Sequence, residues 1–153
     1  MQPRITALCL LPLVACGPQL EDPDRSYELT VTGTSDTCTG DEATYEATFA
    51  YDIFIDGSNA LIQIDSEDFA VGNISGCDLT YQSTAWLEED AGGNFQWQIS
   101  GEAQFEGAAG GCDLGDGIDW DGEERLQVVY SENPEVEVGC DYDMTLTGVL
   151  TGG

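Results

Sequence analysis

The sequence contains no lysine and no histidine, and its only three basic residues are arginines, against thirty aspartates and glutamates. The formal net charge is −27, so no basic surface exists to replace the counterions of DNA or RNA. We therefore expect no nucleic-acid partner and no polybasic attachment to anionic lipid. The missing residue types also exclude imidazole metal sites, histidine-based triads, Schiff bases and P-loop phosphate chemistry.

The apolar run at the N-terminus is too short to span a bilayer as a permanent helix. It follows Arg4 and ends at Leu13-Val14-Ala15-Cys16, which is the order of features in a secretory signal. These four residues resemble the lipobox of bacterial lipoproteins, with Leu13 at −3, Ala15 at −1 and the obligate cysteine at +1. The resemblance implies a signal peptide over residues 1–15, cleavage before Cys16, and attachment of palmitate-type acyl chains there. An ordinary secretory signal is the alternative.

The same resemblance implies a location. Each buried CH₂ of an acyl chain adds about 0.8 kcal/mol, so three chains would anchor the protein firmly. Gly17, rather than Asp, follows the cysteine, which resembles the sorting pattern for the Gram-negative outer membrane. We therefore expect an exported protein that contacts the membrane of the bacterial cell envelope through its lipid. Residues 16–26 are rich in proline and charge and predict a flexible tether, able to lift the domain roughly 30 Å.

Apolar and polar residues alternate along most of the remaining chain, residues 27–153, which we take as a single domain. The alternation is clearest over 27–31, 95–105 and 136–146, and period two predicts strands with one dry face. The turn clusters are short, which favours an all-β, antiparallel meander that closes as a β-barrel or folds as a β-sandwich. The eight predicted strands are 27–34, 43–56, 60–65, 68–74, 77–87, 95–106, 125–131 and 136–150.

Four of the six cysteines remain after Cys9 leaves with the signal and Cys16 takes the lipid. An even number in an exported chain predicts two disulfides, with three possible connectivities. A hairpin of strands 77–87 and 95–106 would bring Cys77 near Cys112, and pairing of the first and last strands would bring Cys38 near Cys140. We therefore predict Cys77–Cys112 and Cys38–Cys140. The spacing contains no C-x-x-C pair, so zinc is disfavoured.

Six carboxylates lie within twelve residues between the sixth and seventh predicted strands, interleaved with glycine. Oxygen ligands on a flexible loop are what Ca²⁺ requires. The pattern D-x-x-D-x-x-D-x-D-G-x-E resembles calcium loops in general, although it departs from the EF-hand spacing. A solvated acidic loop is the alternative in so acidic a chain. The candidate calcium ligands are Asp113, Asp116, Asp119, Asp121 and Glu123.

Three classes of function remain, and by default we expect a structural or adhesive role. A structural or adhesive domain of the cell envelope needs no chemistry. A lipocalin-like barrel would bind a small apolar ligand, and a calcium loop would make a surface-binding module. Trp86 and Trp97 could line a cavity; Trp86 is out of phase with its neighbours and is the candidate exposed binding aromatic. We expect no enzyme, since glycosidase-type carboxylate pairs are inevitable among thirty acids and therefore uninformative.

The charge itself has two interpretations. An excess of carboxylates on every surface suits a marine or salty exterior, because salt shortens the range over which they repel. A concentration of them on one face would instead recruit a basic protein partner.

Overall fold

The computed structural model describes residues 22–38, 45–64, 68–89, 91–107 and 117–153. The predicted signal peptide and the lipidation site Cys16 lie outside these ranges. In the described part of the chain, no helix is both long and apolar enough to cross a membrane. The strands are β1 (Arg25–Asp36), β2 (Glu46–Asp56), β3 (Asn59–Ile64), β4 (Asp68–Ser75), β5 (Asp78–Ser83), β6 (Trp86–Glu88), β7 (Phe95–Gly107), β8 (Gly117–Ser131) and β9 (Asp141–Gly152).

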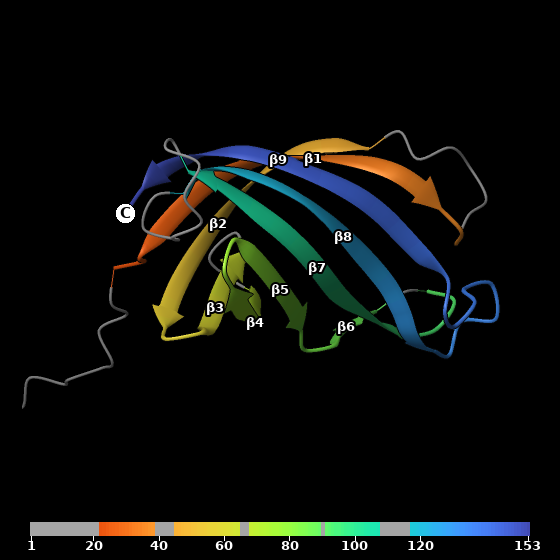
Figure 1. The fold of residues 1–153 in the computed structure, drawn as a ribbon. Coiled ribbons are helices and arrows are strands. Elements are labelled where there is room, and N and C mark those ends of the chain that lie inside the picture. The colour runs from red at the N-terminus through yellow and green to blue at the C-terminus, as the bar shows by residue number, and fades with distance from the viewer. Residues whose placement is uncertain (1–21, 39–44, 65–67, 90, 108–116) are drawn as a thin grey trace, which may run out of the picture.

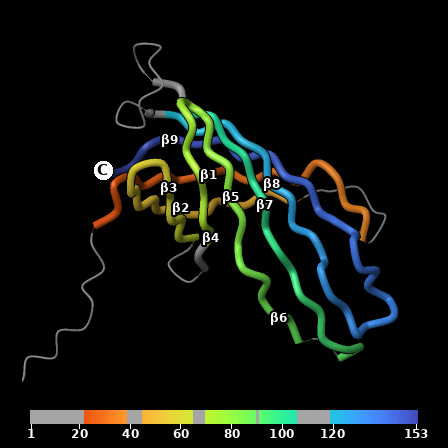
Figure 2. Tube along the Cα trace, turned by 60° about the horizontal axis from the view of Figure 1, so that its bottom comes forward, coloured from red at the N-terminus to blue at the C-terminus, as the bar shows by residue number. Residues whose placement is uncertain are grey.

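The strands form one antiparallel sheet that closes into a barrel (Figure 1). Their order is β5-β4-β3-β2-β1-β9-β8-β7, and pairing of β5 with β7 closes the ring. Short β6 continues beyond β5 along the same edge of β7, as Figure 2 shows. The predicted all-β meander is therefore confirmed, and of the two alternatives the protein adopts the barrel. Pairing of β1 with β9, on which the disulfide prediction rested, is also confirmed.

Alternation along each strand places one face inside the barrel. On β1, Tyr27, Leu29 and Val31 are buried, whereas Glu28 and Thr30 between them are exposed. Tight turns at Gly57 and Gly76, both with positive φ, join β2 to β3 and β4 to β5 where the sequence predicts turns. The largest fully buried side chains are Trp120, Tyr27, Tyr51, Leu29, Ile53, Ile62, Leu79, Leu146, Val31 and Val128.

The predicted strand 77–87 is two strands, β5 and β6, which are separated at residues 84 and 85. Two further predicted boundaries are also wrong. Residues 117–124, expected in an acidic loop, form the first half of β8, where residues 119–124 pair with both β7 and β9. The last strand begins at Asp141 rather than at residue 136. Turns at Pro134 and Gly139, the latter with φ of 92°, interrupt the apparent alternation of residues 136–140. Period two is therefore not sufficient to locate a strand where turn residues fall within it.

Aromatic side chains fill one end of the barrel. The ring of Trp120 packs edge-on against Tyr27, Tyr51, Tyr81 and Phe105, at centroid distances between 5.2 and 6.0 Å. This aromatic plug lies toward the end at which the chain enters β1. The opposite end, which we call the mouth, is formed by the end of β1, the starts of β2, β7 and β9, and the β8–β9 connection.

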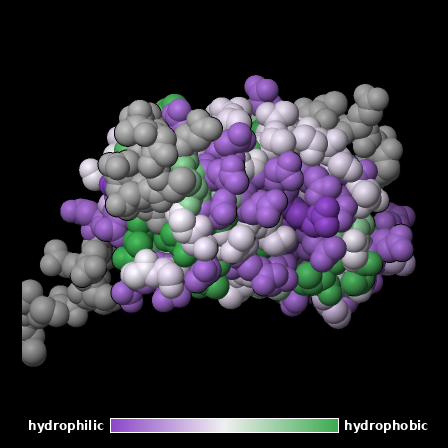
Figure 3. Space-filling view, in the orientation of Figure 1, coloured by the Kyte–Doolittle hydropathy of each residue, from purple (hydrophilic) through white to green (hydrophobic). Residues whose placement is uncertain are grey.

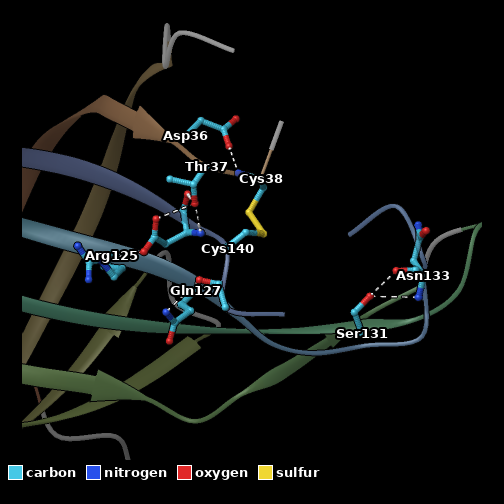
Figure 4. The surroundings of a disulfide bond; sticks show 10 residues. Asp36, Thr37, Cys38, Arg125, Gln127, Ser131, Asn133 and Cys140 are labelled. Carbon is cyan, nitrogen blue, oxygen red and sulfur yellow. Dashed lines mark hydrogen bonds and ion pairs between the residues drawn. A yellow bond between two sulfur atoms is a disulfide. The ribbon is translucent and has the colours of Figure 1, made fainter. Parts of the chain in front are cut away.

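Cys38 and Cys140 form a disulfide at the mouth, as predicted (Figure 4). The bond joins the end of β1 to the start of β9, with a Cα–Cα distance of 5.0 Å. Hydrogen bonds between Thr37 and Asp141 continue the pairing of the two strands up to the bond. Cys77 is also disulfide-bonded, but its expected partner Cys112 lies outside the described residues. The Cys77–Cys112 bond therefore stays a prediction.

Candidate ligand-binding cavity

The mouth half of the barrel contains a cavity of about 850 Å³. Binding sites for small molecules typically measure about 300–1,000 Å³, so this space suits one such ligand. Aromatic side chains supply much of its wall, and aliphatic ones most of the remainder. The aromatic lining residues are Tyr45, Phe49, Tyr51, Trp86, Trp97 and Tyr142. The aliphatic and thioether ones are Val31, Ile64, Ile99, Leu126, Val136 and Met144.

Few polar side chains line this cavity. Asp36, Asn133 and Glu135 lie near the mouth, beside the disulfide and the β8–β9 connection, and Glu124 comes from the middle of β8. Asn133 is buried, and its side chain accepts a hydrogen bond from the backbone N–H of Glu135. In the same turn, the Ser131 hydroxyl group donates a hydrogen bond to the backbone carbonyl of Asn133 and accepts one from its backbone N–H (Figure 4). This part of the rim is therefore held in place by its own hydrogen bonds.

Two neighbouring tryptophans form part of the cavity wall. Trp86 on β6 and Trp97 on β7 are register partners, so they lie side by side on one face. The indole N–H of Trp97 donates to Glu88 at 2.8 Å, and its ring packs edge-on against Phe95. Trp86 is half-buried rather than fully exposed. The break between β5 and β6 shifts the alternation, and Trp86 lines the cavity. Its role as a binding aromatic stays a prediction.

Glu124 lies where the cavity meets the aromatic plug. Only 4% of this residue is exposed, and its neighbours on the inner face of β8 are Gly122 and Leu126. The hydroxyl of Tyr51 donates to Glu124 Oε1 at 2.7 Å, and that of Tyr81 donates to the same oxygen at 2.5 Å. Among the described residues, none donates to Oε2. The carboxyl group therefore lines the cavity, with Oε1 held by two hydroxyl groups and no described donor to Oε2.

Burial controls the titration of this cluster. It raises the pKa of Glu124 above its ordinary value of 4.5, and the hydrogen bonds from Tyr81 and Tyr51 partly offset that rise. Burial also raises the pKa of Tyr81 well above 10, and the neighbouring Glu124 carboxylate raises it further. Tyr81 therefore stays neutral and acts as a donor. Tyr81 fits here because its ring lies against Gly101, where a Cβ would overlap it.

The predicted calcium ligands do not converge in the described part of the chain. Asp119, Asp121 and Glu123 occupy alternate positions on β8 and are exposed on the outside of the barrel. Asp113 and Asp116 lie outside the described residues. Among the residues the structure describes, no group of three or more acidic or sulfur side chains is arranged to hold a metal ion. The full five-residue site therefore stays a prediction, and three of its five residues lie in a strand rather than in a loop.

Glu124, Tyr51 and Tyr81 are the site residues that the sequence analysis did not single out. In the sequence, Glu124 is one of the six carboxylates of the predicted acidic loop. The signal was present, however, because Trp120, Gly122, Glu124, Leu126 and Val128 alternate in one phase. Extending the strand back from Val128 places this single acid on the inner face.

Comparisons with protein-family models, with curated proteins and with solved structures found no match to this chain. The cavity and its lining residues are therefore the features that indicate a function.

Proposed function

We propose that this protein is a non-catalytic binder of a small apolar ligand, held in the mouth half of the barrel. The observation that carries the proposal is the cavity of about 850 Å³ with its largely aromatic and aliphatic wall. A purely structural domain would gain stability by filling such a space, since each buried methylene contributes about 0.8 kcal/mol. Of the roles expected from the sequence, the cavity favours the lipocalin-like carrier over the structural or adhesive domain.

The direction of the mouth fits an anchored carrier. The chain enters β1 at the plugged end, and the mouth lies at the opposite end (Figure 1). If Cys16 carries lipid, the short segment before β1 holds the plugged end toward the membrane and leaves the cavity open to the surrounding solution. We propose this arrangement at the outer membrane, with the Cys77–Cys112 bond as a second clasp at the plugged end, where the β4–β5 turn lies.

Titration calorimetry with a neutral apolar probe tests the proposal. The full chain would carry Cys16→Ala, which removes the predicted lipid and the need for detergent, and 1-decanol would be the probe. We expect saturable binding with one site and a negative heat-capacity change, because apolar surface is buried. Heat that rises without saturation would contradict the proposal.

A matched pair of variants locates the site. Ile99→Trp adds a large side chain to the cavity wall, whereas Val149→Trp adds the same side chain on the outer face, where Val149 is 57% exposed. We expect the first to abolish decanol binding and the second to leave it unchanged. Equal affinities for the two variants would place the bound probe elsewhere.

A further inference from the structure

A carboxyl group at the inner end of an apolar cavity needs an explanation. Removing an ionised acid from water is costly unless it is paired and hydrogen-bonded. The Tyr51 and Tyr81 hydroxyl groups satisfy Glu124 Oε1, and Oε2 has no donor among the described residues. A hydrophobic residue at this position would extend the aromatic plug at a lower cost in folding free energy than a buried acid. A carrier of purely apolar molecules has no use for this group.

The charges around the cavity all have one sign. Asp36, Glu124 and Glu135 line it, and no described lining residue is basic. Arg125 follows Glu124 in the chain, but it lies on the outer face of β8 and pairs with Asp143 at 2.7 Å. A ligand with a carboxylate or phosphate would therefore meet only repulsion, whereas a cationic group would meet attraction at the rim and at the inner end.

Aromatic faces provide the second element of such recognition. Tyr51 contacts Glu124 directly and also lines the cavity, and Trp86 and Trp97 stand side by side farther along the wall. A cation near the face of a tyrosine or tryptophan ring gains about 0.5–2 kcal/mol, more where water is excluded. An apolar wall suits the body of an amphipathic ligand, and a carboxyl group with aromatic neighbours suits a cationic end.

From this arrangement, and resting on the proposed carrier function, we propose that the cavity selects apolar amines. The ammonium group donates to Glu124 Oε2, and the hydrocarbon part extends toward the mouth along Trp86 and Trp97. The Tyr51 and Tyr81 hydroxyl groups are positioning groups, because they fix the carboxyl group from its other oxygen.

Three probes of equal length test the selection. Decylamine, 1-decanol and decanoate share one hydrocarbon chain and differ only in the charge of the end group. Titrated into the full chain carrying Cys16→Ala at neutral pH, decylamine should bind about 10- to 100-fold more tightly than decanol, as a charged hydrogen bond allows. Decanoate should bind more weakly than decanol, because it meets three carboxylates.

Glu124→Gln and Glu123→Gln form a matched pair for the same experiment. Both remove one acidic charge from β8, but Glu124 faces the cavity and Glu123 faces solvent. Glu124→Gln should reduce decylamine affinity to near that of decanol, and urea unfolding of the variant shows independently that it folds. Glu123→Gln should retain the preference for the amine.

The outcomes separate this inference from the proposed function. Binding of decanol and decylamine with equal affinity to the unsubstituted cavity would overturn the selection of amines and leave the carrier function standing. A preference that survives Glu124→Gln would overturn the role of that residue. Failure of all three probes to bind would overturn the carrier function itself.

Discussion

Burial of the Glu124 carboxyl group lowers the stability of the fold, and the same group lines the cavity. It is the one acidic side chain among the buried residues of the described chain, and two tyrosine hydroxyl groups hold one of its oxygens. Natural proteins retain such groups chiefly where they serve recognition or chemistry. Its effect on stability can be measured independently of any ligand.

The pH dependence of stability should report the burial of Glu124. Its pKa is raised in the folded state, so folding is favoured by its protonated form. This contribution is fully present below the unfolded pKa and is lost as the pH rises through the folded pKa. Glu124→Gln removes the loss, so the variant should gain stability over the unsubstituted protein as the pH rises above 4.5. Urea unfolding across a pH series measures the difference.

Glu123→Gln is the control for that series. It relieves general repulsion in the acidic protein without touching a buried group, because Glu123 is exposed on the outer face. Its stability difference should change much less with pH. If both variants followed the same pH curve, the effect would come from overall charge and not from burial of Glu124.

Trp120 is the residue on which the plugged end depends most. It is 1% exposed and packs against four aromatic rings, although its indole N–H has no acceptor among the described residues. Trp120→Ala should lower the free energy of unfolding by about 3–5 kcal/mol. Trp86→Ala should cost clearly less, because that ring is half-buried beside an open space. Equal losses in urea unfolding would contradict this distinction.

At the scale of the strands, local alternation predicted most of the sheet but not every boundary. The pairing of β5 with β7 and the pairing of β1 with β9 agree with the pairings expected from the sequence, and the Cys38–Cys140 bond agrees with the disulfide expected from the second of them. The start of β8 was missed because Asp119, Asp121 and Glu123 are outward-facing acids that locally resemble a loop. This segment is a strand because it pairs with β7 on one side and β9 on the other, and a local sequence pattern does not reveal such pairing.

From the sequence, a ligand-binding cavity is predicted only as an alternative to a structural or adhesive domain. Barrel closure by eight strands leaves an interior that side chains either fill or leave open, and the choice depends on which residues meet across it. Trp97 falls in phase with Phe95 and Ile99 in the alternation over residues 95–105, but the direction of Trp86 depends on the break at residues 84 and 85 between β5 and β6. The pairing of Glu124 with Tyr51 and Tyr81 joins residues 73 and 43 positions apart, which no local pattern reveals.

The disulfide at the mouth should stabilise the barrel as a whole. It spans 102 residues, so it restricts much of the unfolded chain. The double variant Cys38→Ala with Cys140→Ala should lose about 2–4 kcal/mol in urea unfolding. Its far-UV circular dichroism should stay unchanged, because β1 and β9 remain paired along their length. A variant as stable as the parent would contradict the expected role of the bond.

At the scale of the whole molecule, the charge is distributed over the outside of the barrel. Exposed acidic residues occur on strands from β1 to β8, including Glu28, Glu46, Asp78, Glu102 and Glu123. Figure 3 shows hydrophilic side chains across the wall formed by β7 and β8. This spread agrees better with adaptation to a saline medium than with one docking face for a basic partner.

Like charges also meet directly on this wall. Glu102 on β7 and Glu123 on β8 are register partners, both exposed, and opposed carboxylates destabilise a sheet. Salt shortens the Debye length from about 10 Å at 0.1 M to about 3 Å at 1 M. The melting temperature should therefore rise with sodium chloride over this range.

Substitution on β8 separates screening of these charges from a general effect of salt on apolar surfaces. A triple variant with Asp119→Asn, Asp121→Asn and Glu123→Gln removes three outward charges from one strand and changes no buried residue. It should melt at a higher temperature than the parent in low salt, and the gap should narrow as salt is added, because screening already relieves the same repulsion. A gap that stayed constant at all salt concentrations would show that the variant acts through packing or strand propensity, and the surface acids would then have no electrostatic cost for a saline medium to relieve.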